Sequence, residues 1–382
     1  MTRRVFVGST NKPDYLLLVA VLALTVFGVI AVYDASLVYA HSVFGGEYHF
    51  LLLQLGWVGL GLTAMTVVSR ISYWRWQKIA TPFFFLTLVG LLFVLLPTIF
   101  SPILYGARRW LILNPQPLPA LPILGRLSLQ PSELTKISWI LFLAALLTKK
   151  DEKRKGDKIK TVLFFLLLIL GLVVKQPDFG TAMILASIGL GIYFLSGASL
   201  LPFFVSLGVF GILGFSLIMV SPYRRQRLQT YLNPSVSDPI GSGYHLRQVL
   251  ISIGSGGVWG LGLGQSRQKF GYLPEVTGDS IFAIICEETG FVGGVILIVA
   301  YLFLIWRLFR VASRVKEPFG RLIAGGVALW FSSQAVINLA SMVALIPLTG
   351  VPLPLVSYGG SSLVFSLVAL GIVLNVSRET DG

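Results

Sequence analysis

Long apolar runs separated by short polar segments dominate the chain. Residues 15–33 and 161–174, for example, are almost continuously apolar, whereas a membrane-spanning β-strand gives about ten residues of alternating polarity. A helix needs about 20 apolar residues to cross a bilayer. The pattern therefore predicts an all-α, polytopic integral membrane protein with about ten transmembrane helices.

The predicted spans cover most of the chain, so residues 1–382 are expected to form one membrane domain. The spans are residues 15–33, 50–68, 79–97, 137–147, 161–174, 182–195, 200–220, 281–306, 322–346 and 361–376. The first is too long for the core of a cleaved signal peptide, and we expect it to be retained. With the N terminus in the cytoplasm, residues 221–280 become a large extracytoplasmic loop between spans seven and eight.

Composition supports the bilayer as the solvent. Hydrophobic residues make up 55% of the 382 residues and charged residues only 12%, whereas a soluble domain carries about 25% charge. Mean hydropathy is +0.82. So few charges cannot cover a water-facing surface, which excludes a cytosolic enzyme, a disordered tail and a nucleic-acid-binding module. One cysteine and three scattered histidines provide neither a disulfide framework nor a zinc site.

The net charge of +14 is divided between the two sides of the membrane. Residues 149–160 carry seven Lys and Arg and are typical of a cytoplasmic loop. The loop after span eight is also basic. Other cations fall on predicted outer segments, against the usual bias: Arg108, Arg109, Arg126, Lys136, Lys175, Arg224, Arg225, Arg227, Arg247, Arg267 and Lys269. A basic outer surface with few carboxylates attracts an anion.

Arg108, Arg109 and Trp110 follow the third span as part of the sequence GARRW. Arginines beside an indole are typical of an aromatic belt at the membrane surface. They also suit phosphate capture, because a guanidinium fork pairs with two phosphate oxygens at once. The five residues alone leave both interpretations open.

Two further motifs place opposite charges at the membrane edge. Glu133 and Lys136 share one face of the helix that begins in QPSELTK, where helix capping explains the other residues. Lys175 and Asp178 flank a tight turn, KQPDFGT, between two apolar runs. Irregular backbone at membrane depth is tolerated where it is buried in protein or lines a wet cavity.

The loop before span eight contains two carboxylates, Glu275 and Asp279, with Lys269 shortly upstream. On local pattern alone, Asp279 is a candidate helix cap. Glu287 and Glu288 follow inside the span, where ionisable groups indicate function or a specific partner. The glycine-dense residues 254–264 lack the features of a phosphate-binding loop and predict close helix packing or a re-entrant turn.

An uncharged segment, residues 350–362, precedes the last span and contains Ser357. Its two prolines and two glycines suit a lipid-chain groove or a helix break. Simple packing is an equally good interpretation of this segment.

The five motifs GARRW, QPSELTK, KQPDFGT, YLPEVTGDSIFAIICEETGF and PLTGVPLPLVSYGGSS occur in this order among the predicted spans. Together they resemble the SEDS family (shape, elongation, division and sporulation), which contains FtsW and RodA. Residues 268–275 are more similar to FtsW than to RodA. The sequence departs from the family at Thr277 and Gly278, where His-Thr is frequent, and in a longer stretch between Trp110 and Gln130.

This resemblance implies a peptidoglycan glycosyltransferase that polymerises lipid II at the outer face of the bacterial cytoplasmic membrane. It also implies work with a class B penicillin-binding protein and other division or elongation proteins. Asp279 falls at the family's essential aspartate, and the position of Trp110 is associated with activity. We expect Asp279 to be catalytic, as general base. Candidate substrate-binding residues are Arg108, Arg109, Trp110, Glu133, Lys136, Lys175, Asp178, Lys269, Glu275 and Ser357.

No cofactor is predicted. A divalent cation could share the stabilisation of the leaving diphosphate, but the five carboxylates on the basic outer segments (Glu133, Asp178, Asp238, Glu275 and Asp279) have no ligand spacing and do not establish one. Two other classes of protein fit the chain. A transporter or flippase of an anionic polyprenyl lipid would use Glu287, Glu288 and broken helices as its pathway. A non-catalytic division scaffold would need no single carboxylate.

Overall fold

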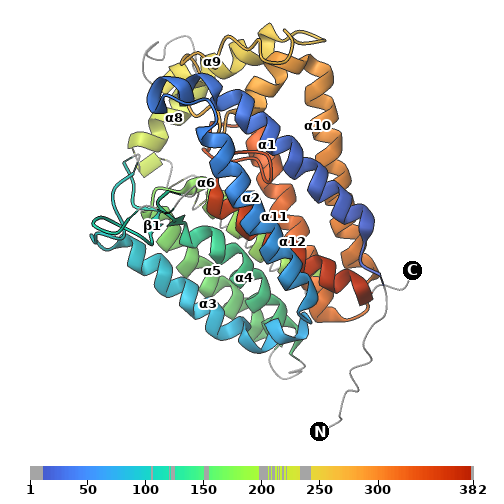
Figure 1. Cartoon of the computed structure of the whole chain (residues 1–382). Coiled ribbons are helices and arrows are strands. Elements are labelled where there is room, and N and C mark those ends of the chain that lie inside the picture. The colour runs from blue at the N-terminus through green and yellow to red at the C-terminus, as the bar shows by residue number, and fades with distance from the viewer. Residues whose placement is uncertain are drawn as a thin grey trace.

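The computed structural model describes residues 12–104, 106–119, 121, 125–149, 155–197, eight separate positions between 205 and 220, 222–232 and 242–379. These residues form an all-α bundle with one short antiparallel strand pair (Figure 1). The helices are α1 (Tyr15–Phe44), α2 (His49–Arg70), α3 (Trp74–Leu95), α4 (Pro131–Thr148), α5 (Lys155–Lys175), α6 (Phe179–Leu195), α8 (Pro222–Leu232), α9 (Ser242–Ser255), α10 (Ile281–Arg314), α11 (Pro318–Met342) and α12 (Gly360–Val376), followed by the 3₁₀ turn η2 (Ser377–Glu379). The strands are β1 (Leu111–Ile112) and β2 (Ser128–Leu129).

Nine of the ten predicted spans coincide with helices of the described chain, from α1 to α6 and from α10 to α12. Among the described residues, six helices are long and apolar enough to cross a membrane, which confirms a multi-pass membrane protein. The seventh predicted span, residues 200–220, lies largely outside the described residues, so the total of ten stays a prediction. Within the predicted outer loop, α8 and α9 are ordered helices.

The first span was predicted too short. α1 continues from Tyr33, where its apolar run was expected to end, to Phe44. The charge of Asp34 marks the apparent end, but its carboxylate is paired with Lys269 Nζ at 3.0 Å. Because that charge is neutralised inside the protein, the helix passes through it without interruption.

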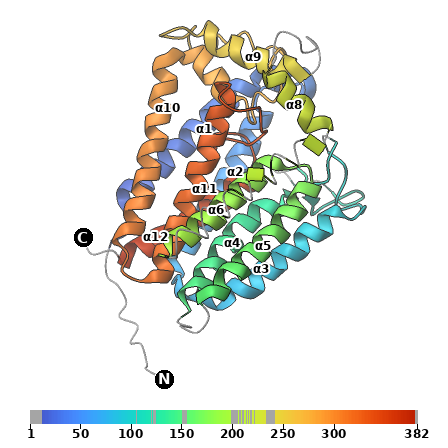
Figure 2. The same ribbon diagram turned by 180° about the vertical axis from the view of Figure 1, so that it is seen from behind.

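α11 is the central helix of the bundle. It packs against α4, α6 and α10, while α12 packs most extensively against α2, and α3 against α4. The view from behind shows α10, α11 and α6 in succession across the bundle (Figure 2). α1 closes the bundle against α10 and α2. The two ends of the described chain meet, since Asp14 N donates to Ser377 Oγ at 3.0 Å.

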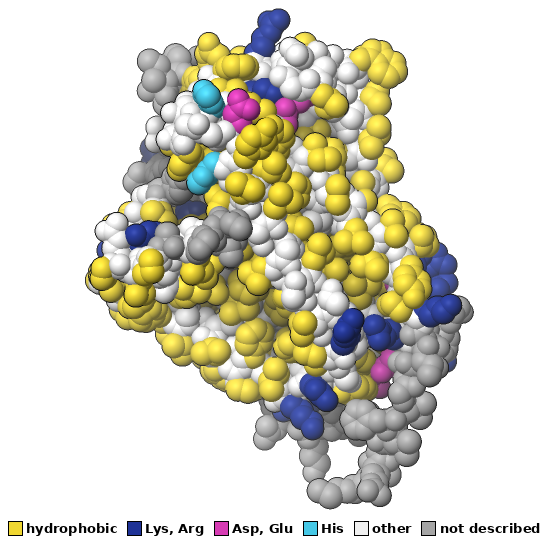
Figure 3. All heavy atoms as spheres, viewed as in Figure 1, with side chains coloured by type: hydrophobic (Ala, Val, Ile, Leu, Met, Phe, Trp, Pro, Cys, Tyr) yellow, Lys and Arg dark blue, Asp and Glu magenta, His cyan; other side chains and the backbone are white. Residues whose placement is uncertain are grey.

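The outer helices turn large apolar side chains outward. Ile30 on α1, Leu86 on α3 and Ile296 on α10 are each at least 60% exposed, and apolar side chains cover much of the face shown in Figure 3. A water-soluble protein rarely exposes apolar patches of this extent. The exposed surface is therefore suited to lipid.

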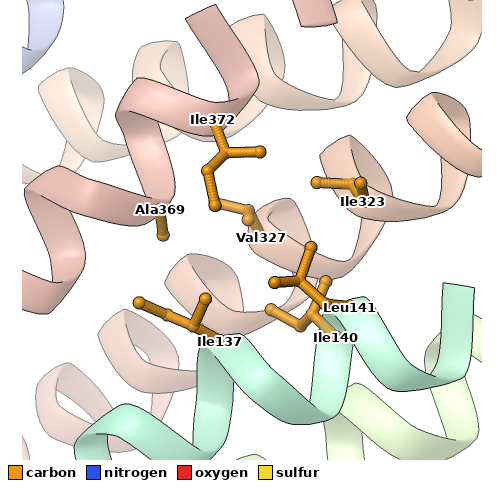
Figure 4. Close-up of a pocket in the computed structure, with 7 residues that line it drawn as sticks. All are labelled: Ile137, Ile140, Leu141, Ile323, Val327, Ala369 and Ile372. Atoms are coloured by element: carbon orange, nitrogen blue, oxygen red, sulfur yellow. The ribbon is translucent and has the colours of Figure 1, made fainter. Parts of the chain in front are cut away.

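A small cavity of about 10 Å³ lies between α4, α11 and α12 (Figure 4). It is lined by Ile137, Ile140, Leu141, Ile323, Val327, Ala369 and Ile372. All seven side chains are aliphatic, and the space is about that of one water molecule. The cavity is thus a gap in apolar packing rather than a site for a lipid chain.

α10 is kinked at Gly290, where the backbone adopts φ 67° and ψ −167°. Only glycine adopts this region readily. A Cβ at Gly290 would lie 2.3 Å from the backbone nitrogen of Gly260, in the loop before α10. The glycine-dense segment therefore does pack closely, as its composition predicts, and it packs against the kink.

We expect Gly290→Ala to lower the apparent melting temperature of the purified protein in detergent. The backbone conformation alone costs on the order of 1–3 kcal/mol with a side chain present, and the contact with Gly260 adds to that. Gly59→Ala is the matched control, because a Cβ at this α2 glycine meets no atom within 4 Å. Equal melting temperatures for the two variants would contradict the packing described.

Candidate active site

Asp279 lies at the end of the loop that leads into α10. The helix begins after Ser280, whose side chain makes no capping hydrogen bond, so Asp279 is not the helix cap that its local pattern suggests. Its backbone carbonyl accepts a hydrogen bond from Asn338 Nδ2 on α11 at 2.9 Å. Its Oδ1 is shielded from solvent and has no hydrogen-bond partner among the described residues. A buried acceptor without a donor is a candidate for binding a ligand.

The surroundings of Asp279 favour its protonated form. Burial raises the pKa of this carboxyl from 3.8 to about 7, and the charge of Glu275 acts in the same direction, whereas Arg227 opposes it. Glu275 itself is exposed. An acid with a pKa near neutral pH is suited to take up and release a proton there.

Helices α8 and α9 bring two further side chains to this region. Arg227 on α8 donates from Nη1 to the carbonyl of Leu348 at 2.9 Å. His245 on α9 shares a hydrogen bond of 2.7 Å with Ser280 Oγ. Burial lowers the pKa of His245 to about 4, with a further contribution from Arg227. His245 is therefore neutral at pH 7.

The segment between α11 and α12, residues 343–359, forms the opposite side of the site. Tyr358 N donates to the carbonyl of Thr277 at 2.8 Å, which ties this segment to the loop of Asp279. Ser357 is buried, and its Oγ accepts a hydrogen bond from Leu353 N at 2.8 Å. The hydroxyl of Ser357 thus closes a local turn.

Glu133 and Lys136 form an ion pair of 2.7 Å, and both are buried. The Lys136 ammonium also donates to Gln334 Oε1 at 3.0 Å and lies 4.8 Å from the ring centroid of Trp330. Gln334 Nε2 in turn donates to the carbonyl of Pro352 at 2.9 Å. The pair predicted from the sequence is therefore connected to the segment beside Asp279 through one amide side chain.

The strand pair β1–β2 carries the GARRW motif to the turn between α5 and α6. Arg109 donates from Nε to the carbonyl of Gln176 at 2.8 Å and from Nη2 to that of Pro177 at 2.6 Å. Gln130, just after β2, donates from Nε2 to Asp178 Oδ2 at 3.2 Å. Asp178 also caps α6, because its Oδ1 accepts from Thr181 N.

The remaining residues of these two motifs differ in exposure. Arg108 is half-buried, with Nη1 donating to the carbonyl of Ser101 at 2.8 Å. Trp110 is also half-buried, immediately before β1. Lys175 is exposed at the last turn of α5. The structure therefore leaves Lys175 as the most accessible cation of this group.

Lys269 lies in a separate buried cluster. Its ammonium pairs with Asp34 on α1 at 3.0 Å and with Glu288 on α10 at 2.9 Å. Glu288 also accepts from the backbone nitrogens of Gly264 and Ser266. Glu287 accepts from Ser252, Ser266 and Arg267. The two glutamates within α10 therefore hold the preceding loop against the helix.

Several residues of the site and of the buried cluster around Lys269 were not singled out from the sequence. Asn338 and Gln334 lie four residues apart in an apolar span, a spacing that places both on one face of the helix. Amide side chains inside a membrane bundle usually bond to other elements, so this signal was present. Asp34 likewise interrupts the first apolar run. His245 gives no such signal.

The family model for FtsW, RodA and SpoVE, described as a cell cycle protein, matches residues 15–382. The chain belongs to this family. It is 38% identical over 373 residues to stage V sporulation protein E of Bacillus subtilis, covering 96% of this chain and 98% of the relative. It is 38% identical to a probable peptidoglycan glycosyltransferase FtsW of Trichlorobacter lovleyi, covering 95% and 93% of the two chains.

Solved structures of family members have the same fold. A chain from a peptidoglycan synthase complex that coordinates polymerization and crosslinking matches with a TM-score of 0.77 and 29% identity, covering 96% of this chain and 98% of that one. RodA of Thermus thermophilus matches with a TM-score of 0.69 and 28% identity, over 96% and 97% of the two chains. The membrane-protein fold expected from the sequence is thereby confirmed.

Breaking the Glu133–Lys136 pair is expected to destabilise the protein strongly. Removing one partner of a buried pair leaves an uncompensated charge, at a cost of about 3–5 kcal/mol. Glu133→Gln and Lys136→Met should each lower the apparent melting temperature, and the double variant should recover part of the loss. A double-mutant cycle measures this coupling, and strictly additive effects would contradict the pairing.

Asp279→Asn is expected to stabilise the protein more at pH 8 than at pH 5. The folded pKa of about 7 lies above the ordinary value of 3.8, so the unfolded chain binds fewer protons between these values. Stability therefore falls as pH rises through this range, and asparagine removes the loss. Melting curves at both pH values test this, with Glu47→Gln as control. An equal gain at both pH values would contradict it.

Proposed function

We propose that this chain is a peptidoglycan glycosyltransferase that polymerises lipid II, with Asp279 as the general base. The observation that carries the proposal is a shielded carboxyl oxygen that has no partner among the described residues, on an acid whose pKa is near neutral. Membership of the family and the names of its relatives supply the reaction class. The experiments below test the residue and the activity together.

In this mechanism Asp279 takes the proton of the acceptor sugar hydroxyl. The oxygen so activated forms a bond to the anomeric carbon of the donor, and the bond from that carbon to the polyprenyl diphosphate breaks. The diphosphate leaves with its bonding electrons and an added negative charge. Arg108, Arg109 and Lys175 are the candidates to stabilise that charge electrostatically, with Trp110 beside them.

Most of the other predicted substrate-binding residues are already bonded within the protein, and we assign them a role in holding the structure of the site. Glu133 and Lys136 are buried as a pair, and Asp178 caps α6. Lys269 is occupied by two carboxylates, and Ser357 closes a turn. Of this set, the exposed Glu275 beside Asp279 is the best placed to meet an acceptor.

The proposal assigns no step to a metal ion. Within the described residues, no group of three or more His, Cys, Asp or Glu side chains is arranged to hold one. The proposal assigns the charge of the leaving group to arginine and lysine, because their cationic groups stabilise a developing negative charge electrostatically.

Location and partner follow from the substrate. We place the protein in the bacterial cytoplasmic membrane, with a cytoplasmic N terminus and an extracytoplasmic active site, because the basic residues 149–160 favour the cytoplasm. The likeness to a chain of a peptidoglycan synthase complex supports a class B penicillin-binding protein as partner. Other division or elongation proteins would assemble around this pair.

A transporter is less well supported. Its pathway was expected to use Glu287 and Glu288, but both carboxylates accept hydrogen bonds from the loop before α10. They anchor the loop and are not free to bind a passing ion. A non-catalytic scaffold predicts that no single carboxylate is needed for activity, so the variant below also tests it.

Asp279→Asn in the purified protein is expected to reduce lipid II polymerisation at least about 100-fold, because general-base catalysis contributes this much or more. Glu47→Gln, at a carboxylate whose side chain is 46% exposed, should leave the rate unchanged. Glycan products are measured with and without a class B penicillin-binding protein. Normal polymerisation by Asp279→Asn would refute the general-base assignment.

The rate of the unmodified protein should rise with pH through an apparent pKa near 7. Asp279 must lose its proton before it can act as base, and burial raises its pKa to about 7. Initial rates at saturating lipid II between pH 5.5 and pH 8.5 give this profile. A rate independent of pH across that range would argue against Asp279 as base.

A further inference from the structure

Two amide side chains on α11 hold the segment that faces Asp279. Gln334 and Asn338 are one helical turn apart, and both are fully buried. Gln334 Nε2 donates to the carbonyl of Pro352 at 2.9 Å, and Asn338 Nδ2 donates to that of Val351 at 2.7 Å. The central helix thus binds two consecutive carbonyls of irregular backbone.

Asn338 makes one contact that Gln334 does not. Its Nδ2 also donates to the carbonyl of Asp279 at 2.9 Å. Both amide hydrogens are therefore used, one on each side of the site, and these two acceptors fix which end of the amide is nitrogen. A single side chain joins the loop of Asp279 to the segment between α11 and α12.

The same two segments touch at two further points. Tyr358 N donates to the carbonyl of Thr277 at 2.8 Å. Gly350 has φ +71°, and a Cβ placed on it would lie 3.8 Å from Asp279 Oδ2. The carboxyl of Asp279 therefore rests against the segment that Asn338 holds.

We propose that Asn338 is a positioning residue for the reaction: it fixes the backbone of Asp279 against residues 350–352, so that the carboxyl oxygen faces the acceptor hydroxyl. The inference rests on the proposed role of Asp279. Asn338 does not itself touch the reacting atoms. A displacement of about 1 Å can reduce a rate about 100-fold. Loss of the hydrogen bond from Asn338 to the carbonyl of Asp279 should therefore lower turnover.

The contribution of Gln334 is different. It connects the same segment to the Glu133–Lys136 pair, but it makes no hydrogen bond to the loop of Asp279. Loss of Gln334 should therefore affect stability first. Ser333 is a cleaner control on α11, because the one hydrogen bond of its Oγ among the described residues goes to the carbonyl of Trp330 within the same helix.

The test compares Asn338→Ala, Asn338→Asp and Ser333→Ala in the purified full-length chain with its penicillin-binding partner. For Asn338→Ala we expect kcat to fall at least about tenfold while KM for lipid II changes by less than about threefold, since positioning acts on turnover. Ser333→Ala should keep both constants. Melting temperatures identify variants that fail to fold.

Asn338→Asp gives a second readout, because a carboxyl group can replace at most one of the two hydrogen bonds that the amide donates, so kcat should fall here as well. A second carboxylate beside Asp279 disfavours its ionised form, so the rising limb of the pH–rate profile should move to higher pH. The other charges that face Asp279, Glu275 in its own loop and Arg227 on α8, are the same in all variants. The rising limb of the pH–rate profile of Ser333→Ala should lie at the same pH as that of the unmodified protein.

Two results would overturn the inference. The first is a normal kcat in folded Asn338→Ala. The second, which decides the matter if the alanine variant does not fold, is a folded Asn338→Asp with a normal kcat. An inactive Asp279→Asn together with a fully active Asn338→Ala would refute positioning alone, whereas an active Asp279→Asn would refute the proposed function.

Discussion

The site depends on how irregular backbone between two spanning helices finds hydrogen-bond partners. A bilayer offers no water to backbone carbonyls that lack a partner. The segment between α11 and α12 is not helical, so several of its carbonyls need donors from elsewhere in the protein. Side chains of neighbouring helices supply the donors: Asn338 to Val351, Gln334 to Pro352 and Tyr301 to Pro354. A segment held in this way has a fixed position, and it can therefore serve as one wall of a site.

Charge inside the bundle follows the same constraint. Lys136 is matched by Glu133, and Lys269 by Asp34 and Glu288, because an unpaired buried charge is costly. Glu133 and Asp279 each have a shielded oxygen without a donor among the described residues, but Glu133 is ion-paired whereas Asp279 forms no ion pair there. Asn338 donates to the backbone carbonyl of Asp279 and not to its carboxyl group. The carboxyl oxygen Oδ1 therefore stays available. Such a group is retained at a cost to stability, as is common at active sites.

The spans were predictable because helix length and apolar content are local properties, and nine of them coincide with described helices. The importance of Asp279 could be predicted only from the family resemblance of its motif. The local pattern favoured a helix cap that the structure does not contain. Pairings across the sequence could not be predicted. Lys269 meets Asp34 across a separation of 235 residues, and no periodicity along the chain encodes which distant charge a lysine meets.

The loop before α10 shows why such long-range contacts decide the geometry of the site. Gly260 and Gly290 allow the loop to lie directly on the helix that follows it, and Glu287 and Glu288 bind its backbone there. The loop is thus bound to α10 at both ends, by these contacts at one end and by the chain itself at Ser280. Residues 270–279 span two fixed points. Asn338 and Tyr358 then need to fix only the last few residues to place Asp279.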